Sequence, residues 1–146
     1  MRRIVAIAGT ALLAGCGGND AIHVTDLPAA CAGDSAALVK ALAKAPGRVL
    51  VDGEPISHCF TANEDAADVQ ALGTSLVGAA QRLGDRAASD ARAALELGYL
   101  VGAARRGSER SSVTAEMVRR LEGETGRVGS NASAYKRGLR AGLVKG

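Results

Sequence analysis

The chain has 146 residues, with 18 Lys and Arg against 15 Asp and Glu, so its formal net charge is only +3 at pH 7. Aromatic residues make up 2% of the sequence, which excludes a groove of stacking platforms for single-stranded nucleic acid. A core must therefore be built mainly from Leu, Val and Ala, and such a domain gains from covalent reinforcement. We expect no nucleic-acid partner.

The first fifteen residues follow the order of a secretory signal peptide. Arg2 and Arg3 supply positive charge, an apolar stretch follows, and small residues close the segment. The apolar stretch, of about a dozen residues, is too short to span a bilayer comfortably as a permanent helix. The sequence therefore predicts a signal peptide over residues 1–15. An ordinary secretory signal with a chance cysteine, or a short membrane anchor, is the alternative.

Leu13-Ala14-Gly15-Cys16 resembles the lipobox of bacterial lipoproteins, in which a diacylglyceryl group is attached to the cysteine before cleavage. The resemblance implies cleavage before Cys16, lipidation of Cys16 and a firm anchor in a cell membrane, on its extracytoplasmic face. A glycine pair then opens a polar stretch without clear periodicity. We expect residues 16–30 to form a lipidated flexible tether and residues 31–146 to form a single mostly helical domain.

Cys31 and Cys59 remain as an even pair if Cys16 carries lipid. In an exported, oxidising setting an even pair favours a disulfide, which would close a loop of about 29 residues and contribute on the order of 3–4 kcal/mol. His23 and His58 could complete a zinc set with these cysteines. However, adjacent His58 and Cys59 point to opposite faces of a strand, which disfavours shared ligation. We therefore expect neither a metal nor a cofactor.

A short helix is expected over residues 34–45, because Asp34 and Ser35 are helix-start residues and apolar residues follow at helical spacing. Pro46 and Gly47 end the run.

Asp52-Gly53 lies between two β-prone runs and predicts a hairpin over residues 48–60. Pairing across this turn would set Val49 opposite Ile56 and Leu50 beside Pro55, which only an edge strand tolerates. An isolated hairpin is marginal, so the predicted disulfide would pin its second strand to the start of the first helix.

Two longer helices follow. Residues 61–64 fit a capping box, and apolar residues then recur at steps of three and four as far as Leu83, which predicts an amphipathic helix ending near Gly84. A further helix begins near Ser89 and runs to Gly107. It is apolar on most of its surface, so we expect it to be the central and most buried helix.

Gly98 and Gly102 lie four residues apart on this second helix. Such spacing lets a neighbouring backbone approach closely, as in the glycine pairs of membrane helices. In a soluble domain we favour tight packing within the core over a dimer contact.

The last third of the chain predicts two more helices. Apolar residues from Val113 to Leu121 define a shorter helix ending near Gly123, and residues 123–130 are expected to form a loop. A final helix starts near Asn131 and carries four apolar residues on one face: Ala132, Tyr135, Leu139 and Leu143. The fold class is therefore mostly α, a small bundle of three to five helices with a short β-hairpin.

The segment from Leu97 to Gly107, the Asp52-Gly53 turn and the Cys31 and Cys59 pair are together similar to small lipoproteins of bacteria with GC-rich genomes. The resemblance covers about half of the predicted mature chain and implies no activity.

Charge is distributed unevenly along the sequence. Residues 16–104 carry six basic and eleven acidic side chains, whereas residues 105–146 carry ten basic and four acidic ones. This basic third could contact anionic lipid or an acidic partner, and its candidate contact surface consists of Arg105, Arg106, Arg119 and Arg120. Alternatively, these arginines are solvated side chains that balance the C-terminal ends of helices.

Catalytic signatures are weak. Ser133 and Lys136 match the Ser-x-x-Lys spacing of serine β-lactamases, but the companion motifs and the chain length of that fold are missing. The glycine-rich run over residues 123–129 lacks the Gly-Lys-Ser/Thr ending of a phosphate-binding loop. His23 and His58 are the only imidazole candidates for a general base near neutral pH.

The leading functional hypothesis is a lipid-anchored cell-envelope protein that binds a partner protein, a wall polymer or a lipid surface without catalysis. The alternatives are a small extracytoplasmic hydrolase that uses His58 or His23, and an inhibitor of an envelope enzyme. A histidine beside a carboxylate and a hydroxyl in a cleft would favour the enzyme, and an apolar groove between helices would favour binding.

Overall fold

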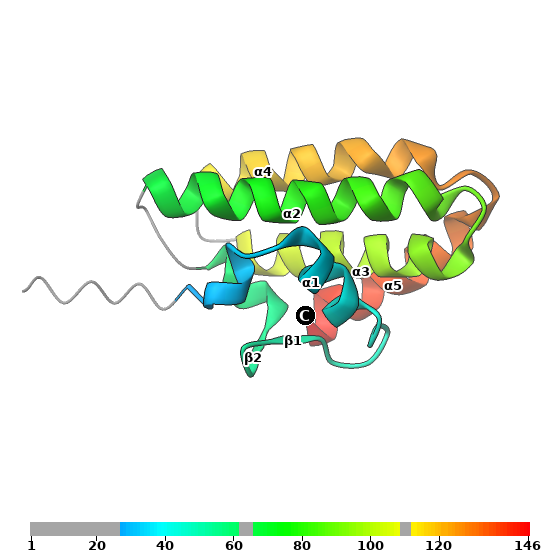
Figure 1. Ribbon diagram of the computed structural model, residues 1–146. Helices are drawn as coiled ribbons and strands as arrows, with labels where there is room; N and C mark the ends of the chain where they lie inside the picture. Colours follow the sequence, from blue (N-terminus) through cyan, green and yellow to red (C-terminus); the bar gives the residue numbers. More distant parts are fainter. Residues whose placement is uncertain (1–26, 62–65, 109–111) are drawn as a thin grey trace, which may run out of the picture.

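The computed structural model describes residues 27–61, 66–108 and 112–146, and within these ranges the protein is mostly α-helical, as the sequence predicts (Figure 1). The described α-helices are α1 (Ser35–Leu42), α2 (Ala66–Ala87), α3 (Ala91–Ser108), α4 (Ser112–Gly123) and α5 (Ala132–Lys145). One two-stranded antiparallel sheet consists of β1 (Leu50–Val51) and β2 (Glu54–Pro55). Short 3-10 helices are η1 (Ala29–Cys31), η2 (Ile56–Phe60), η3 (Glu124–Arg127) and η4 (Gly129–Asn131).

The long helices form two layers. In Figure 1, α2 and α4 lie together at the top, and α3 and α5 lie together beneath them, with α1 and the hairpin on the near and lower side. α3 contacts each of the other four α-helices. Most of its residues, from Ala93 to Gly107, are buried, which confirms that it is the central helix.

The first helix starts where the sequence predicts. The Asp34 carboxylate accepts a hydrogen bond of 3.1 Å from the Ala36 amide and so caps α1, because the first amides of a helix have no partner within it. α1 ends at Leu42, three residues before the predicted end, and places Leu38 and Leu42 in the core.

The hairpin is present but its second strand is shorter than predicted. Leu50 pairs with Pro55, and the Ile56 amide donates to the Val49 carbonyl at 3.2 Å, so the predicted register is confirmed. Asp52 and Gly53 both have positive φ, as a tight type I′ turn requires.

Residues 56–60 were expected to continue the strand and instead form η2. In a strand, His58 would share one face with Ile56 and Phe60. The three-residue period of a 3-10 helix instead buries Ile56 and Cys59 together and leaves His58 exposed. Burial of the apolar side chains therefore favours the 3-10 conformation over the strand.

The amphipathic helix α2 runs three residues beyond Gly84 to Ala87. Its buried face is the predicted one and includes Leu72, Leu76 and Leu83. The capping box over residues 61–64 lies outside the described residues, apart from Thr61.

Asp90 caps the following helix, α3, because its carboxylate accepts a 2.8 Å hydrogen bond from the Arg92 amide.

The expectation of a loop over residues 123–130 was wrong, because η3 and η4 occupy most of it. The Thr125 hydroxyl donates to the Glu122 carbonyl at 2.7 Å, and the Asn131 amide group donates to the Ala87 carbonyl at 2.9 Å. These contacts attach the connection to α4 and to the end of α2.

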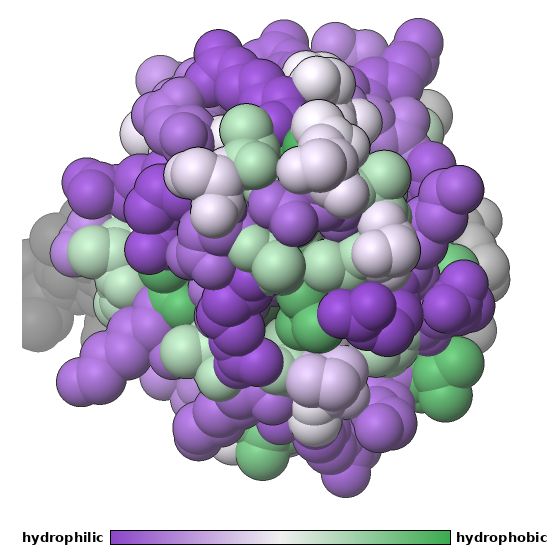
Figure 2. All heavy atoms as spheres, turned by 90° about the vertical axis from the view of Figure 1, so that its right-hand side faces the viewer, coloured by the Kyte–Doolittle hydropathy of each residue, from purple (hydrophilic) through white to green (hydrophobic). Residues whose placement is uncertain are grey.

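Figure 2 shows the end of the bundle at which this connection lies. The surface there is largely hydrophilic, and its apolar areas are interrupted by hydrophilic side chains.

The buried face of α5 also differs from the predicted one. Tyr135 and Leu139 are only half-buried and Leu143 is exposed, whereas Ala134, Gly138 and Gly142 are buried. The reason is the close approach of α5 to α3. Glycine lets the two backbones come together, so the larger side chains of α5 lie beside the contact instead of within it.

Candidate functional site

Cys31 and Cys59 form the predicted disulfide. Their Cα atoms are 5.6 Å apart, and both residues are fully buried. Because both thiols are used in this bond, neither is available as a zinc ligand. Cys16 and His23 lie outside the described residues, so the predicted lipidation site has no structural description.

The N-terminal segment of the described chain is fastened at a second point. The Asp52 carboxylate, in the hairpin turn, accepts a 2.9 Å hydrogen bond from the Ala30 amide. Leu27 and Ala30, which belong to the predicted tether, pack against the core. The disulfide and this hydrogen bond together fix where the N-terminal segment joins the domain, next to η2.

A cleft of about 690 Å³ opens beside η2 and the C-terminal turns of α3 and α5. Its basic lining residues are Arg48, His58, Arg106 and Lys145. Ser57 and Thr61 add hydroxyl groups, and no acidic side chain is present among the described residues that line it.

Two of these cations are held by main-chain carbonyls. Arg106 donates to the carbonyl of Leu143, at 3.2 Å, and to that of Val144. Lys145 Nζ donates to the Pro46 carbonyl at 3.2 Å. Arg106 therefore satisfies the last carbonyls of α5, as expected of a cation at the negative end of a helix.

His58 is the one sequence-predicted base that the structure describes. Its Nδ1 lies 3.2 Å from Glu54 Oε2, and its side chain is 50% exposed. The Thr61 hydroxyl donates to the main-chain carbonyl of His58, at 3.1 Å, and not to its ring. The neighbouring Ser57 is buried. A histidine and a carboxylate are therefore paired, but no hydroxyl among the described residues is hydrogen-bonded to this imidazole.

The four arginines of the predicted contact surface lie in three separate settings. Arg105 Nη2 is 2.6 Å from Glu122 Oε1, which joins α3 to α4. Arg119 and Arg120 both lie 3.4 Å from the Glu116 carboxylate on α4, and Arg106 lines the cleft. Two carboxylates, those of Glu116 and Glu122, thus contact three of the four arginines, and the contact surface stays a prediction.

A groove of about 440 Å³ lies between α2 and α4. Val69, Val77 and Met117 give it an apolar floor, with Glu116 and Arg120 at its side. It is the type of surface that favours binding, although nothing in the structure shows what covers it.

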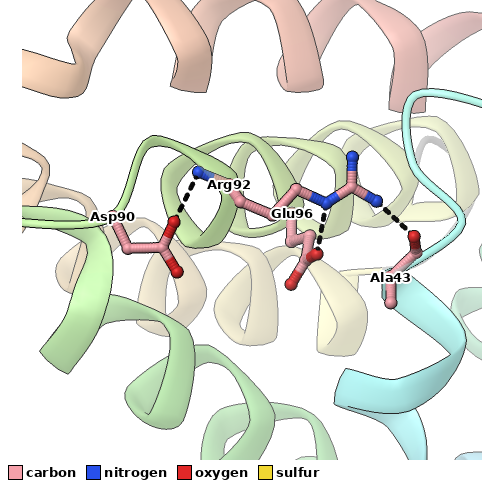
Figure 3. Close-up of polar contacts among 4 residues, drawn as sticks. All are labelled: Ala43, Asp90, Arg92 and Glu96. Atoms are coloured by element: carbon pink, nitrogen blue, oxygen red, sulfur yellow. Dashed lines mark hydrogen bonds and ion pairs between the residues drawn. The ribbon is translucent and has the colours of Figure 1, made fainter.

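A part-buried ion pair within α3 also contacts the end of α1 (Figure 3). Arg92 Nε donates to Glu96 Oε1 at 2.8 Å, and the Arg92 guanidinium also donates to the Ala43 carbonyl at the end of α1. The Glu96 side chain is 7% exposed. This cluster is satisfied internally, and we assign it to structure.

Within the described ranges, no group of three or more His, Cys, Asp or Glu side chains is placed to hold a metal ion. In the same ranges, no helix has both the length and the apolar character needed to cross a membrane. Ser133 and Lys136 are exposed on α5.

Arg48 and Lys145 were not predicted from the sequence as members of a site. The cleft draws its basic side chains from positions 48, 58, 106 and 145, and no local spacing signals such a set. Only the packing of the hairpin against the ends of α3 and α5 brings them together.

Comparisons with family models, with curated proteins and with solved structures found no match to this chain.

Proposed function

We propose that this protein is a lipid-anchored cell-envelope protein, held through Cys16 on the extracytoplasmic face of a membrane, whose helical domain binds a partner without transforming it. The observation that carries the proposal is the disulfide between Cys31 and Cys59. Structural disulfides belong to exported proteins and are rare in the cytosol. The chain has 3 cysteines, so the disulfide leaves only Cys16, the cysteine that follows Leu13-Ala14-Gly15.

The cleft supports binding over catalysis. Basic side chains from four segments line it, which suits an anionic group. A nucleophilic mechanism, in contrast, needs a hydroxyl or thiol within hydrogen-bonding reach of its base. The Thr61 hydroxyl donates to a main-chain carbonyl, and the disulfide occupies the two described thiols.

Metabolic labelling with a fatty-acid analogue tests the anchor. The full-length chain should incorporate the label and sediment with membranes, and Cys16→Ser should do neither. The matched control is the double variant Cys31→Ser/Cys59→Ser, which also removes thiols but keeps Cys16 and should still be labelled. Label on Cys16→Ser, or an unlabelled wild type released into the medium, would contradict the anchor.

The pair formed by His58 and Glu54 favours a hydrolase as the second candidate, because a carboxylate that orients an imidazole is part of many general-base sites. A panel of activated esters tests it with the wild type and His58→Gln. If the protein only binds its partner, the two should hydrolyse the esters equally slowly. Turnover by the wild type that is lost in His58→Gln would reject the binding proposal in favour of the enzyme.

A further inference from the structure

The cleft beside η2 concentrates positive charge that is not neutralised locally. Arg48, Arg106 and Lys145 line it, and none of the described residues that line it has a carboxylate side chain. The Glu54 carboxylate lies 3.2 Å from the His58 ring, outside this lining. Gly146 also lines the cleft. An anion entering the cleft would therefore meet a surplus of cations.

These cations retain hydrogen-bond donors for a ligand. A guanidinium has five N–H donors and an ammonium has three, so the carbonyl contacts of Arg106 and Lys145 leave donors free on each. Arg48 is exposed and forms no hydrogen bond or ion pair with another described residue. Contacts to main-chain carbonyls also hold Arg106 and Lys145 in place, which lowers the entropy lost when they bind a ligand.

The guanidinium groups of Arg48 and Arg106 both lie near the hydroxyl of Tyr99. Burial raises the pKa of the Tyr99 hydroxyl, and the 3.2 Å hydrogen bond from the Val49 amide, Arg106 and Arg48 all oppose this rise. Planar guanidinium groups match the oxygens of a phosphate in pairs, and an ammonium adds a point charge. A set of two arginines, one lysine and one histidine is therefore typical of a phosphate site.

We propose that this cleft binds a phosphate ester, and that the head groups of anionic phospholipids supply it. The assignment of the source rests on the proposed lipid anchor. Cys59 directly follows His58, and its Cα is 5.6 Å from that of Cys31, so the chain coming from Cys16 joins the domain beside the cleft. Fully extended, the segment from Cys16 to Leu27 spans at most about 40 Å. A lipid on Cys16 would therefore keep the cleft within reach of the membrane surface.

Phosphate binding is measured apart from anchoring with the unlipidated full-length variant Cys16→Ser. Titration with sn-glycerol 3-phosphate, followed by amide NMR, should shift Gly107 and His58 in the cleft and leave Gly73 in the α2–α4 groove unchanged. Uncharged glycerol is the matched probe and should shift none of them. No saturable shift at the cleft with glycerol phosphate would overturn the proposal, whatever the labelling of Cys16 shows.

Arg48→Gln is the decisive substitution. Arg48 forms no hydrogen bond or ion pair with another described residue, so its loss should leave thermal unfolding unchanged. Affinity for glycerol phosphate should fall about tenfold, the usual effect of losing a hydrogen bond between charged groups. Arg119→Gln removes the same charge outside the cleft and should leave affinity unchanged. Equal affinities of Arg48→Gln and Arg119→Gln would overturn the site.

Vesicles identify the source of the phosphate. Cys16→Ser should sediment with vesicles that contain phosphatidylglycerol and remain in solution with vesicles of phosphatidylcholine alone. Adding Arg48→Gln to this variant should weaken its binding to the phosphatidylglycerol vesicles. Binding of glycerol phosphate without binding to either vesicle would retain the phosphate site and overturn the lipid as its source.

Discussion

At the scale of single residues, Tyr99 connects the hairpin to the central helix. It is fully buried, and its hydroxyl accepts the Val49 amide, which would otherwise lack a partner as the chain approaches β1. Burial raises the pKa of Tyr99 above its ordinary 10.0, and the Val49 hydrogen bond and the nearby Arg106 and Arg48 oppose this rise. Burial likewise raises the pKa of Tyr135. The protein therefore holds both tyrosines in the neutral form more firmly than the unfolded chain does.

The free energy of unfolding should fall at alkaline pH because of these two residues. A raised pKa in the folded state means that the contribution is fully present below the unfolded value of 10.0 and is lost as the pH rises through the higher folded value. Urea unfolding at a series of pH values from neutral to alkaline measures how steeply the free energy of unfolding falls with pH. Tyr99→Phe should make this fall less steep. At neutral pH the same variant should lose about 0.5–1.5 kcal/mol with the Val49 hydrogen bond. If neither Tyr99→Phe nor Tyr135→Phe changes the dependence of the free energy of unfolding on pH, the two tyrosines are not its cause.

Arg92 neutralises a carboxylate that the fold has placed in the interior. Because the Glu96 side chain is 7% exposed and that of Arg92 is 47% exposed, Arg92→Met should leave Glu96 buried without its partner but partly screened by solvent. We expect a loss of about 1–3 kcal/mol in the free energy of unfolding. The double variant Arg92→Met/Glu96→Met should recover part of this loss. A double variant less stable than Arg92→Met would show that the Glu96 carboxylate is not the cause.

At the scale of elements, the contact between α3 and α5 is made by glycines on both helices. A Cβ on Gly98 would lie within 3.0 Å of main-chain atoms of Tyr135 and Leu139, and a Cβ on Gly138 would do the same at Leu95 and Tyr99. Each glycine in a helix costs about 1 kcal/mol relative to alanine. The cost is offset because two backbones in direct contact gain dispersion energy along their length.

Adding a single methyl group should therefore separate these helices. Gly98→Ala and Gly138→Ala are each expected to lower the free energy of unfolding by about 1–3 kcal/mol or more, because backbone atoms cannot move aside as a flexible side chain can. Gly123→Ala is the control, since a Cβ there meets nothing within 4 Å. It should be neutral or gain up to about 1 kcal/mol. Similar stabilities for the three variants in thermal unfolding would refute the close contact.

The sequence predicted this interface in part. The spacing of Gly98 and Gly102 indicated a close approach within the core, and the structure confirms it. The matching spacing of Gly138, Gly142 and Gly146 was equally visible, but the apolar residues beside it suggested a different buried face. The predicted buried face of a helix is determined by the spacing of large apolar residues such as Leu, Tyr and Val. Glycine has no side chain to mark that face, although it allows two helices to pack closely.

Other parts of the fold depended on contacts distant in sequence. Asp52-Gly53 specified its turn locally, so the hairpin register was predictable. The 3-10 conformation of residues 56–60 depends on the core that buries Ile56 and Phe60. The cleft also joins Arg48 to Lys145 across most of the chain, which no local pattern could indicate.

At the scale of the whole molecule, the chain is joined at both of its described ends to the same region. The N-terminal segment is fixed by the disulfide and by Asp52, and the end of α5 is fixed by Arg106 and by the bond from Lys145 to Pro46. α3 passes through the centre and contacts the other α-helices. With one Phe and two Tyr in the sequence, this arrangement relies on small side chains in close contact and on covalent closure.

The disulfide should therefore supply a large share of the stability. It joins residues 28 positions apart, for which the chain-entropy model gives about 3–4 kcal/mol. Cys31→Ser/Cys59→Ser should lose about this amount in urea unfolding while keeping its helical circular dichroism, because α2 to α5 lie outside the loop that the disulfide closes. Adding a reductant should lower the stability of the wild type to that of the variant and leave the variant unchanged. A loss below about 1 kcal/mol would mean that the contact between Asp52 and Ala30, together with the packing of Leu27, holds the N-terminal segment without the bond.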